Sequence, residues 1–202
     1  MSATAISICS NALLRLGADP INSFDEGDPA GSNLDSARLA ANLWPTIRRQ
    51  TLRGHNWNCA LKRVLLSPDT ASPSFGWSYQ FLRPTDWLRT VSVGLEPEDR
   101  FEYVTEGAYF LSNETALPLR YVFDNENPAT YDAGLVAALE VAMAAAMAYP
   151  ITKSTSLADE LLALADRHLA QARSSDGQDD PPETLGDSML MAARYGRRLG
   201  VS

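Results

Sequence analysis

The sequence predicts an α+β protein, in which an antiparallel bundle of about four helices carries an inserted antiparallel β-sheet and an extended C-terminal arm. Segments towards both ends have apolar residues at helical spacing, whereas the middle alternates with period 2. A polar, Pro- and Gly-containing tail follows. We therefore divide the 202 residues into a helical domain at 1–74 and 129–173, a β-rich insertion at 75–128 and a flexible arm at 174–202.

Two helices are predicted in the first part of the helical domain. Apolar residues recur every three or four positions in ISICSNALLRL, and Gly17 suits the C-terminal stop of this helix. A second helix begins at a plausible capping box formed by Ser32 and Asp35. Pro45 is expected to kink this helix or to split off a second piece near 46–54.

Two more helices are predicted in the second part of the domain. The alanine-rich segment 132–149 has one apolar stripe, and Pro150 is expected to end it. The last helix is expected at 156–173, opened by Ser156 and Asp159. The alanines should let neighbouring helices approach closely.

The β insertion begins in FGWSYQFLRPTDWLR, where Phe75, Trp77, Tyr79 and Phe81 alternate with smaller or polar residues before Trp87. This alternation predicts a strand with an aromatic face. Further strands are expected at 88–95, 100–104, 108–112 and 118–123, with a hairpin turn at Glu106 and Gly107.

The aromatic strand has three interpretations. A base-stacking platform needs interleaved basic residues, but only Arg83 and Arg89 lie near. A ligand cage is slightly more plausible. The favoured interpretation is the buried face of a strand that packs on the helices, because aromatic side chains suit half-buried pleated surfaces.

Composition limits the classes of function. The chain is 45% hydrophobic and 21% charged, with a formal net charge of −8, which disfavours general nucleic-acid binding. Its two cysteines, Cys9 and Cys59, form no disulfide framework or CxxC metal pattern and are expected to be free thiols in a reducing compartment. No secretory signal is expected, and Glu140 interrupts the most apolar run at 133–150, so no membrane partner is predicted.

No catalytic, cofactor or metal site is predicted. The nucleophile elbow, P-loop, dinucleotide and HExxH motifs do not occur in the sequence. His55 and Cys59 are four residues apart and could form a thiol dyad, although a packed segment is the favoured interpretation. The acidic stretches at 24–28, 96–99 and 124–128 could bind cations, but solvated loops are favoured.

The C-terminal arm ends in an apolar and then basic stretch, MLMAARYGRRLGVS. Such a segment could dock on a partner surface and become ordered there. The candidate docking residues, apolar anchors and arginines together, are Met189, Leu190, Met191, Arg194, Tyr195, Arg197 and Arg198.

Several stretches together, in this order and spacing, resemble the bacteriophage tail tubular protein A family. They are NALLRLGADPI, the segment ending in HNWNCA, the aromatic strand entering PTDWLR, and the EG hairpin, within roughly residues 3–176. Members of this family are head-to-tail adaptors, also called connector or gatekeeper proteins. The resemblance implies a non-enzymatic virion protein at the head–tail junction, assembled in the host cytoplasm.

The same resemblance implies partners. The expected ring, commonly of twelve copies, binds the portal protein, offers an attachment site to the tail tube or nozzle, and surrounds double-stranded DNA that passes through without specific binding. From the residues alone, an alternative remains: a small monomeric ligand- or protein-binding module that uses the aromatic strand 75–89. A thiol hydrolase using Cys59 and His55 is a third possibility.

Overall fold

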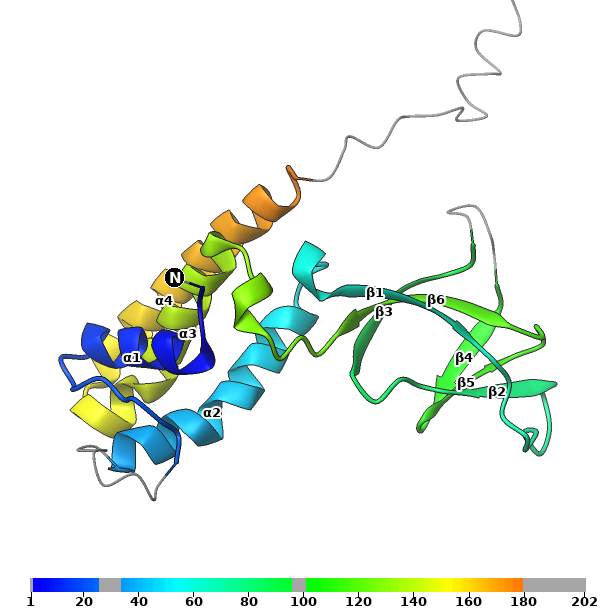
Figure 1. The fold of residues 1–202 in the computed structure, drawn as a ribbon, viewed down its shortest axis with the longest axis horizontal. Helices are drawn as coiled ribbons and strands as arrows, with labels where there is room; N and C mark the ends of the chain where they lie inside the picture. The colour runs from blue at the N-terminus through cyan, green and yellow to red at the C-terminus, as the bar shows by residue number, and fades with distance from the viewer. Residues whose placement is uncertain (1, 26–33, 96–100, 180–202) are drawn as a thin grey trace, which may run out of the picture.

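The computed structural model describes residues 2–25, 34–95 and 101–179. They form an α+β protein with two parts, as Figure 1 shows. One part, here called the helical body, consists of four α-helices. The other, the β lobe, consists of two small antiparallel sheets and projects from one end of the body. The predicted α+β class is confirmed for the helices and the antiparallel strands, while residues 180–202 of the predicted arm lie outside the described residues.

The first helix, α1 (Ala5–Arg15), ends as the sequence predicts. Thr4 and Ser7 form a reciprocal capping box at its start. At its end Gly17 has a φ of 71°, and the Ala18 amide donates to the carbonyl of Leu13. A left-handed residue directly after a helix is a standard stop and favours glycine.

The second helix, α2 (Leu34–Arg53), runs through Pro45 as one continuous element. Of the two expected outcomes, a kink or a split, the split with a separate piece near 46–54 is therefore wrong. Trp44, Arg48 and Leu52 continue one buried stripe through and beyond the proline, so tertiary packing outweighs the hydrogen bond that Pro45 cannot donate. Of the predicted capping box, Ser32 lies outside the described residues.

The central helix of the body is α3 (Ala133–Thr152), which packs against α1, α2 and α4. The Asp132 carboxylate caps its first turn. The helix continues for two residues past Pro150. Because Pro150 lies in the last turn, its missing amide donor interrupts few hydrogen bonds of the helix. By length and apolar composition α3 could cross a membrane, but a core helix of a bundle has the same pattern.

The last helix, α4 (Thr155–Asp176), starts at the Ser154 cap and extends three residues beyond the predicted end. The predicted arm at 174–202 therefore begins inside a helix. The helices α3 and α4 form the most extensive contact in the molecule. All seven candidate docking residues of the arm lie outside the described residues.

The β lobe contains two three-stranded sheets. The first has the order β1-β6-β3, built from β1 (Leu61–Leu66), β3 (Trp87–Val93) and β6 (Leu117–Phe123). The second has the order β2-β5-β4, built from β2 (Tyr79–Leu82), β4 (Tyr103–Glu106) and β5 (Tyr109–Ser112). Gly107, with a φ of 54°, lies in the predicted hairpin turn between β4 and β5.

The sequence places the start of the β region too late. Strand β1 lies in the range assigned to the helical domain at 1–74, and it pairs with β6 over its full length. The insertion therefore spans Leu61 to Phe123 in the structure. The stretch LKRVLL does not alternate strictly, so its period gave no strand signal.

Each part has its own core. The core of the body combines side chains from all four helices with Trp57 and Tyr131 from the connections to the lobe and Val122 from strand β6. The core of the lobe lies between its two sheets and contains five buried side chains: Phe81, Phe110, Leu117, Leu119 and Tyr121.

Candidate functional site

The aromatic stretch is built into the lobe, and it packs on the opposite sheet instead of on the helices. Its strand covers only Tyr79–Leu82, because Gly76 has a φ of 83° and interrupts the extended chain. Phe81 is fully buried against Phe110, whereas Phe75 is 87% exposed. The prediction of a strand from Phe75 packed on the helices is therefore wrong in its start and in its partner.

The remaining aromatic residues of the stretch border this small core. Tyr79 and Trp87 pack against it, and the Trp87 ring makes an edge contact with Phe110 at 6.2 Å. The guanidinium groups of Arg83 and Arg53 lie over the Trp87 ring at 4.5 and 5.9 Å. Trp77 is only partly buried, outside the strand. Phe81 and Trp87 thus hold the lobe together.

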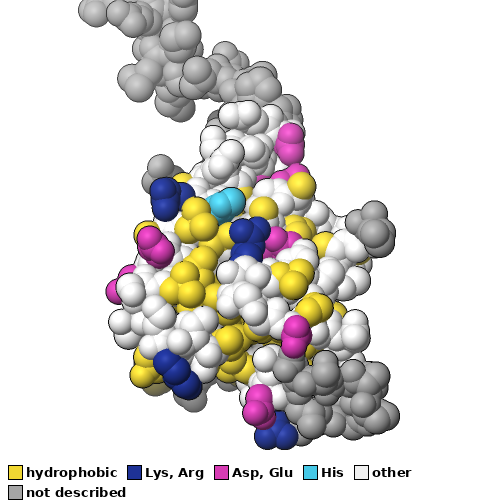
Figure 2. All heavy atoms as spheres, turned by 90° about the vertical axis from the view of Figure 1, so that its left-hand side faces the viewer, with side chains coloured by type: hydrophobic (Ala, Val, Ile, Leu, Met, Phe, Trp, Pro, Cys, Tyr) yellow, Lys and Arg dark blue, Asp and Glu magenta, His cyan; other side chains and the backbone are white. Residues whose placement is uncertain are grey.

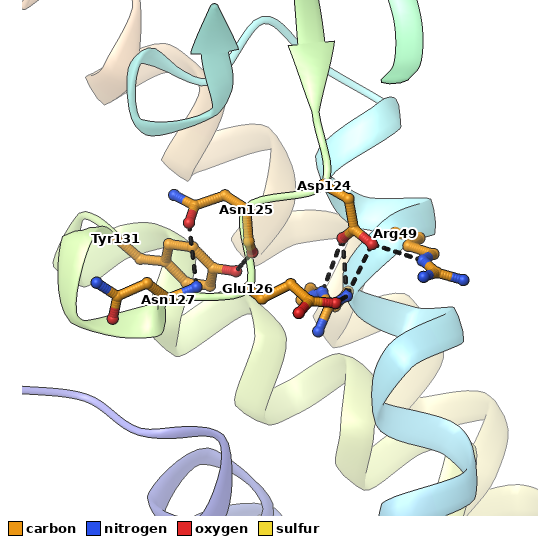
Figure 3. A network of polar contacts seen from close by, with 7 residues as sticks. Arg49, Asp124, Asn125, Glu126, Asn127 and Tyr131 are labelled. Atoms are coloured by element: carbon orange, nitrogen blue, oxygen red, sulfur yellow. Dashed lines mark hydrogen bonds and ion pairs between the residues drawn. The ribbon is translucent and has the colours of Figure 1, made fainter. Parts of the chain in front are cut away.

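A buried ion-pair cluster joins α2 to the chain that leaves β6 (Figure 3). The guanidinium group of Arg48 donates from Nε and Nη2 to both oxygens of the Asp124 carboxylate, at 2.9 Å each, and from Nη2 to Glu126 at 2.9 Å. Arg49 donates to Asp124 at 2.7 Å. The side chains of Arg48 and Asp124 are 6% and 8% exposed. We call this cluster the first clamp.

Hydrogen bonds extend the first clamp along the chain from β6 to α3. The Asn125 amide donates to the carbonyl of Cys59 at 2.7 Å and to the hydroxyl of Thr130 at 2.8 Å. The buried Tyr131 hydroxyl donates to the carbonyl of Asn125. Burial raises the pKa of Tyr131 well above its ordinary value, so this hydroxyl stays a donor. The first clamp therefore fixes where the lobe leaves the body.

A second clamp fixes where the chain enters the lobe. The carboxylate of Asp176, at the end of α4, accepts from the Asn58 amide at 3.2 Å, and the Asn58 side chain donates to the Asp176 carbonyl at 3.0 Å. His55 Nε2 lies 3.5 Å from the Asp176 carboxylate. The buried Asp176 thus ties the last helix to the connection between α2 and β1.

These contacts also bear on the thiol dyad. Burial, with Asp176 adding to it, raises the pKa of the Cys59 thiol to about 11. Burial also lowers the pKa of His55 against the opposing effect of Asp176. His55 faces Asp176 and the edge of Trp57, with ring centroids 4.8 Å apart. A thiol that stays protonated at neutral pH is a poor nucleophile, so the site supports packing and not thiol chemistry.

The acidic stretches behave differently from one another. Asp124 is buried and ion-paired, so the solvated-loop interpretation of 124–128 is wrong at this residue. Residues 26–28 of the first stretch and the whole of 96–99 lie outside the described residues. Within the described chain no group of three or more His, Cys, Asp or Glu side chains could hold a metal ion.

A groove of about 530 Å³ runs between α2 and α4. These two helices barely contact each other, because both pack on α3, whose small side chains Ala142, Ala145 and Ala146 form the floor. Ile47 of α2 and the apolar side chains of α4 form the walls. Gln50, Asp159, Asp166 and Arg173 stand around them.

Hydrophobic side chains also reach the outer surface of the body. Seen from the helical end, they form a band with acidic and basic side chains at its sides (Figure 2). Three large hydrophobic residues of the helices are more than half exposed: Leu14, Tyr149 and Leu162. Of these, Leu162 lines the groove, and exposed apolar surface of this kind is typical of a protein interaction surface.

Sequence reasoning missed the clamps and the groove. Arg48 and Arg49 look like ordinary charges of a helix, and Asp124 like a loop carboxylate; only the fold brings them together. A partial signal for the groove was present, since Ala158, Leu162, Ala165 and Leu169 share one face of α4.

Comparison with protein-family models gave no match, and none of the curated proteins searched matches the sequence.

Proposed function

We propose that this protein is a structural head-to-tail adaptor of a bacteriophage, without enzymatic activity. It forms a ring of twelve copies that binds the portal protein, extends the DNA channel and gives the tail tube or nozzle its attachment site. Its place is the virion, at the head–tail junction. The observation that carries the proposal is the two-part architecture: a helical body with apolar surface, and a β lobe held to it by two clamps.

The two parts suit a protein that must bind on two sides. The body offers an apolar groove and exposed Leu14, Tyr149 and Leu162 for contacts with neighbouring copies or a ring above. The lobe is tied at both of its chain crossings, by Arg48 with Asp124 and by Asn58 with Asp176. A lobe fixed in this way can present the same surface in every copy of a ring.

Charge is the second support. A ring of twelve chains, each with a formal charge of −8, carries a charge on the order of −100. Such a ring repels DNA phosphates, which suits a channel through which DNA must slide without being held.

The alternative, a monomeric binding module at 75–89, has less support. Phe81 is fully buried, and Trp87 packs against the same core, so the aromatic side chains stabilise the lobe itself. Phe75 is the exception, at 87% exposed, and a single exposed ring does not make a groove.

Electron microscopy of the full chain, alone and mixed with portal rings of the same phage, tests the proposal. We expect a second ring stacked on the portal and in register with it. A monodisperse small particle that leaves the portal unchanged would contradict the adaptor function. Binding by a variant with Arg194→Gln, Arg197→Gln and Arg198→Gln should be weaker if the arm docks; unchanged binding would place the interface elsewhere.

A further inference from the structure

The groove between α2 and α4 has an apolar interior, with Asp159 and Asp166 along its acidic side and Arg173 at the end nearest the C-terminus of α4. Its floor and walls are formed mainly by Ile47, alanines of α3 and α4, and Leu162 and Leu169. Leu162 is 58% exposed and points its apolar surface to this face. Asp159 and Asp166 lie two helical turns apart on α4, about 10 Å along its axis.

Neither carboxylate has an ion-pair partner in the described part of the chain. Both are exposed, and both lie on the side of α4 that borders the groove. The groove therefore suits an occupant with apolar side chains followed by positive charges. An uncharged or acidic segment would leave the two aspartates unpaired beside it.

We propose that residues 189–199 of the same chain bind in this groove when the protein is free. This segment, MLMAARYGRRL, has the required chemistry: Met189, Leu190 and Met191 for the apolar floor, and three arginines for the acidic side. It is the C-terminal part of the arm and lies outside the described residues. The inference goes beyond the adaptor function and does not depend on a portal.

The linker between α4 and the segment is long enough for the segment to bind in the groove of its own chain. Helix α4 ends at Asp176, one turn after Arg173, which borders the near end of the groove. The groove follows α4 from Arg173 back to Ala158, or about 22 Å. Residues 180–188 could span up to about 30 Å, and they include two prolines and a glycine that suit a reversal of direction.

A short connection also favours the chain's own segment over one from another molecule. A segment tethered by a short linker has an effective concentration in the millimolar range near its site. A weak contact, built from a few apolar side chains and exposed ion pairs, can then be occupied within one chain although it would not hold two chains together. When the segment occupies the groove, neither of them is free to bind another protein. A partner that binds either one more tightly would displace this contact.

Crosslinking in the full chain tests the location. Leu162→Cys places a thiol in the groove and Met191→Cys places one in the segment, and a short bismaleimide should join them within one chain. The control pair is Gln171→Cys with Met191→Cys, because Gln171 is exposed on the opposite side of α4. The native thiols should react slowly, since burial raises the pKa of Cys9 to about 12 and that of Cys59 to about 11.

We expect the groove pair to form the intramolecular product about tenfold faster than the control pair. Equal rates would overturn the proposal. A product that joins two chains would also overturn it, and would identify a second copy as the source of the segment.

Trypsin cleavage at Arg194, Arg197 and Arg198 tests the role of charge in the full chain. Replacing Asp159→Asn and Asp166→Asn together should speed cleavage about fivefold, the effect of losing two exposed ion pairs. The control, Glu160→Gln with Glu114→Gln, changes the net charge equally, away from the groove, and should leave the rate as in the unmodified chain. Equal rates for the two variants would overturn the assignment of the arginines to the acidic side.

Discussion

The helical body and the β lobe are stabilised in different ways. The body buries side chains from four helices around α3, and they form one continuous apolar core. In the described part of the lobe, the apolar core between its two short sheets consists of five buried side chains. Its chain crossings to the body are held by polar contacts, with Asp124 and Asp176 as the buried acceptors.

The difference indicates that apolar burial and polar contacts have separate roles in the two parts. A large apolar core makes the body stable by itself, because apolar burial is the main favourable contribution to folding. The lobe has a core near the lower limit for independent stability, so it depends on the body. Ion pairs with defined geometry then fix the orientation of the lobe, which non-directional apolar contacts alone would not do.

The largest effect is expected from truncating the lobe core. Phe110 is fully buried and makes edge contacts with Trp87 and Tyr103. Phe110→Ala should destabilise the lobe by about 4 kcal/mol, from lost burial and the cavity left behind. Hydrogen exchange of the full chain should show faster exchange in β2, β4 and β5, with α3 still protected.

The matched control for this prediction lies in the body. Leu139→Ala also truncates a fully buried side chain and should cost about 3 kcal/mol. Here exchange should accelerate in α3 and in the β1-β6-β3 sheet as well, because Leu61, Val122 and Leu88 of that sheet pack on the body core. If Phe110→Ala accelerates hydrogen exchange in α3 as much as Leu139→Ala does, the body and the lobe unfold as one unit. The two parts would then not differ in how they are stabilised.

The next effect concerns the first clamp. Arg48→Met leaves the Asp124 carboxylate buried with only the exposed Arg49 as an ion-pair partner, and should cost about 3 kcal/mol. Urea denaturation measures this change. Arg49→Met is the control on the same carboxylate: its side chain is 57% exposed, so the loss should be much smaller than for Arg48→Met.

A double-mutant cycle sharpens this result. The combination of Arg48→Met and Asp124→Asn should cost clearly less than the sum of the two single changes, because no unpaired buried charge remains. Additive costs would mean that the two side chains stabilise the protein independently. That result would contradict the role of Arg48 and Asp124 as a coupled ion pair in the first clamp.

The helices could be predicted well from the sequence because their buried stripes recur with a helical period. The stop at Gly17 also depends on local chemistry, whereas α4 opens at Ser154 and not at the predicted Ser156. The error at Pro45 has a physical cause: packing of Trp44 and Arg48 continues the helix through a residue that locally disfavours it.

Prediction was poorer in the lobe and failed at the junction. Four of the strands after the aromatic stretch were expected near their observed positions, but β1 pairs with β6 from more than fifty residues away and carries no period of its own. Contacts such as Arg48 with Asp124 form between residues distant in sequence. Neither residue differs locally from an ordinary surface charge, so only the fold identifies them.

The smallest of the three effects concerns the second clamp and pH. In the folded protein burial lowers the pKa of His55, while Asp176 opposes this and the nearby Arg173 and Arg89 add to it. In the unfolded chain His55 titrates near 6.5, so between that pH and its lower folded value the unfolded chain binds more protons. Stability should therefore decline slightly as pH falls through about 6.5, and the decline should stop below the folded pKa.

Replacing the histidine isolates its share of this pH dependence. His55→Gln should flatten the profile of unfolding free energy between about pH 7 and pH 5. Urea denaturation at each pH measures this profile. If stability rises instead as the pH falls, the attraction of Asp176 outweighs burial, the folded pKa is raised, and the second clamp is strongest with a charged His55. That outcome would make both clamps ion pairs, and the lobe would then be held to the body by charge at each of its two crossings.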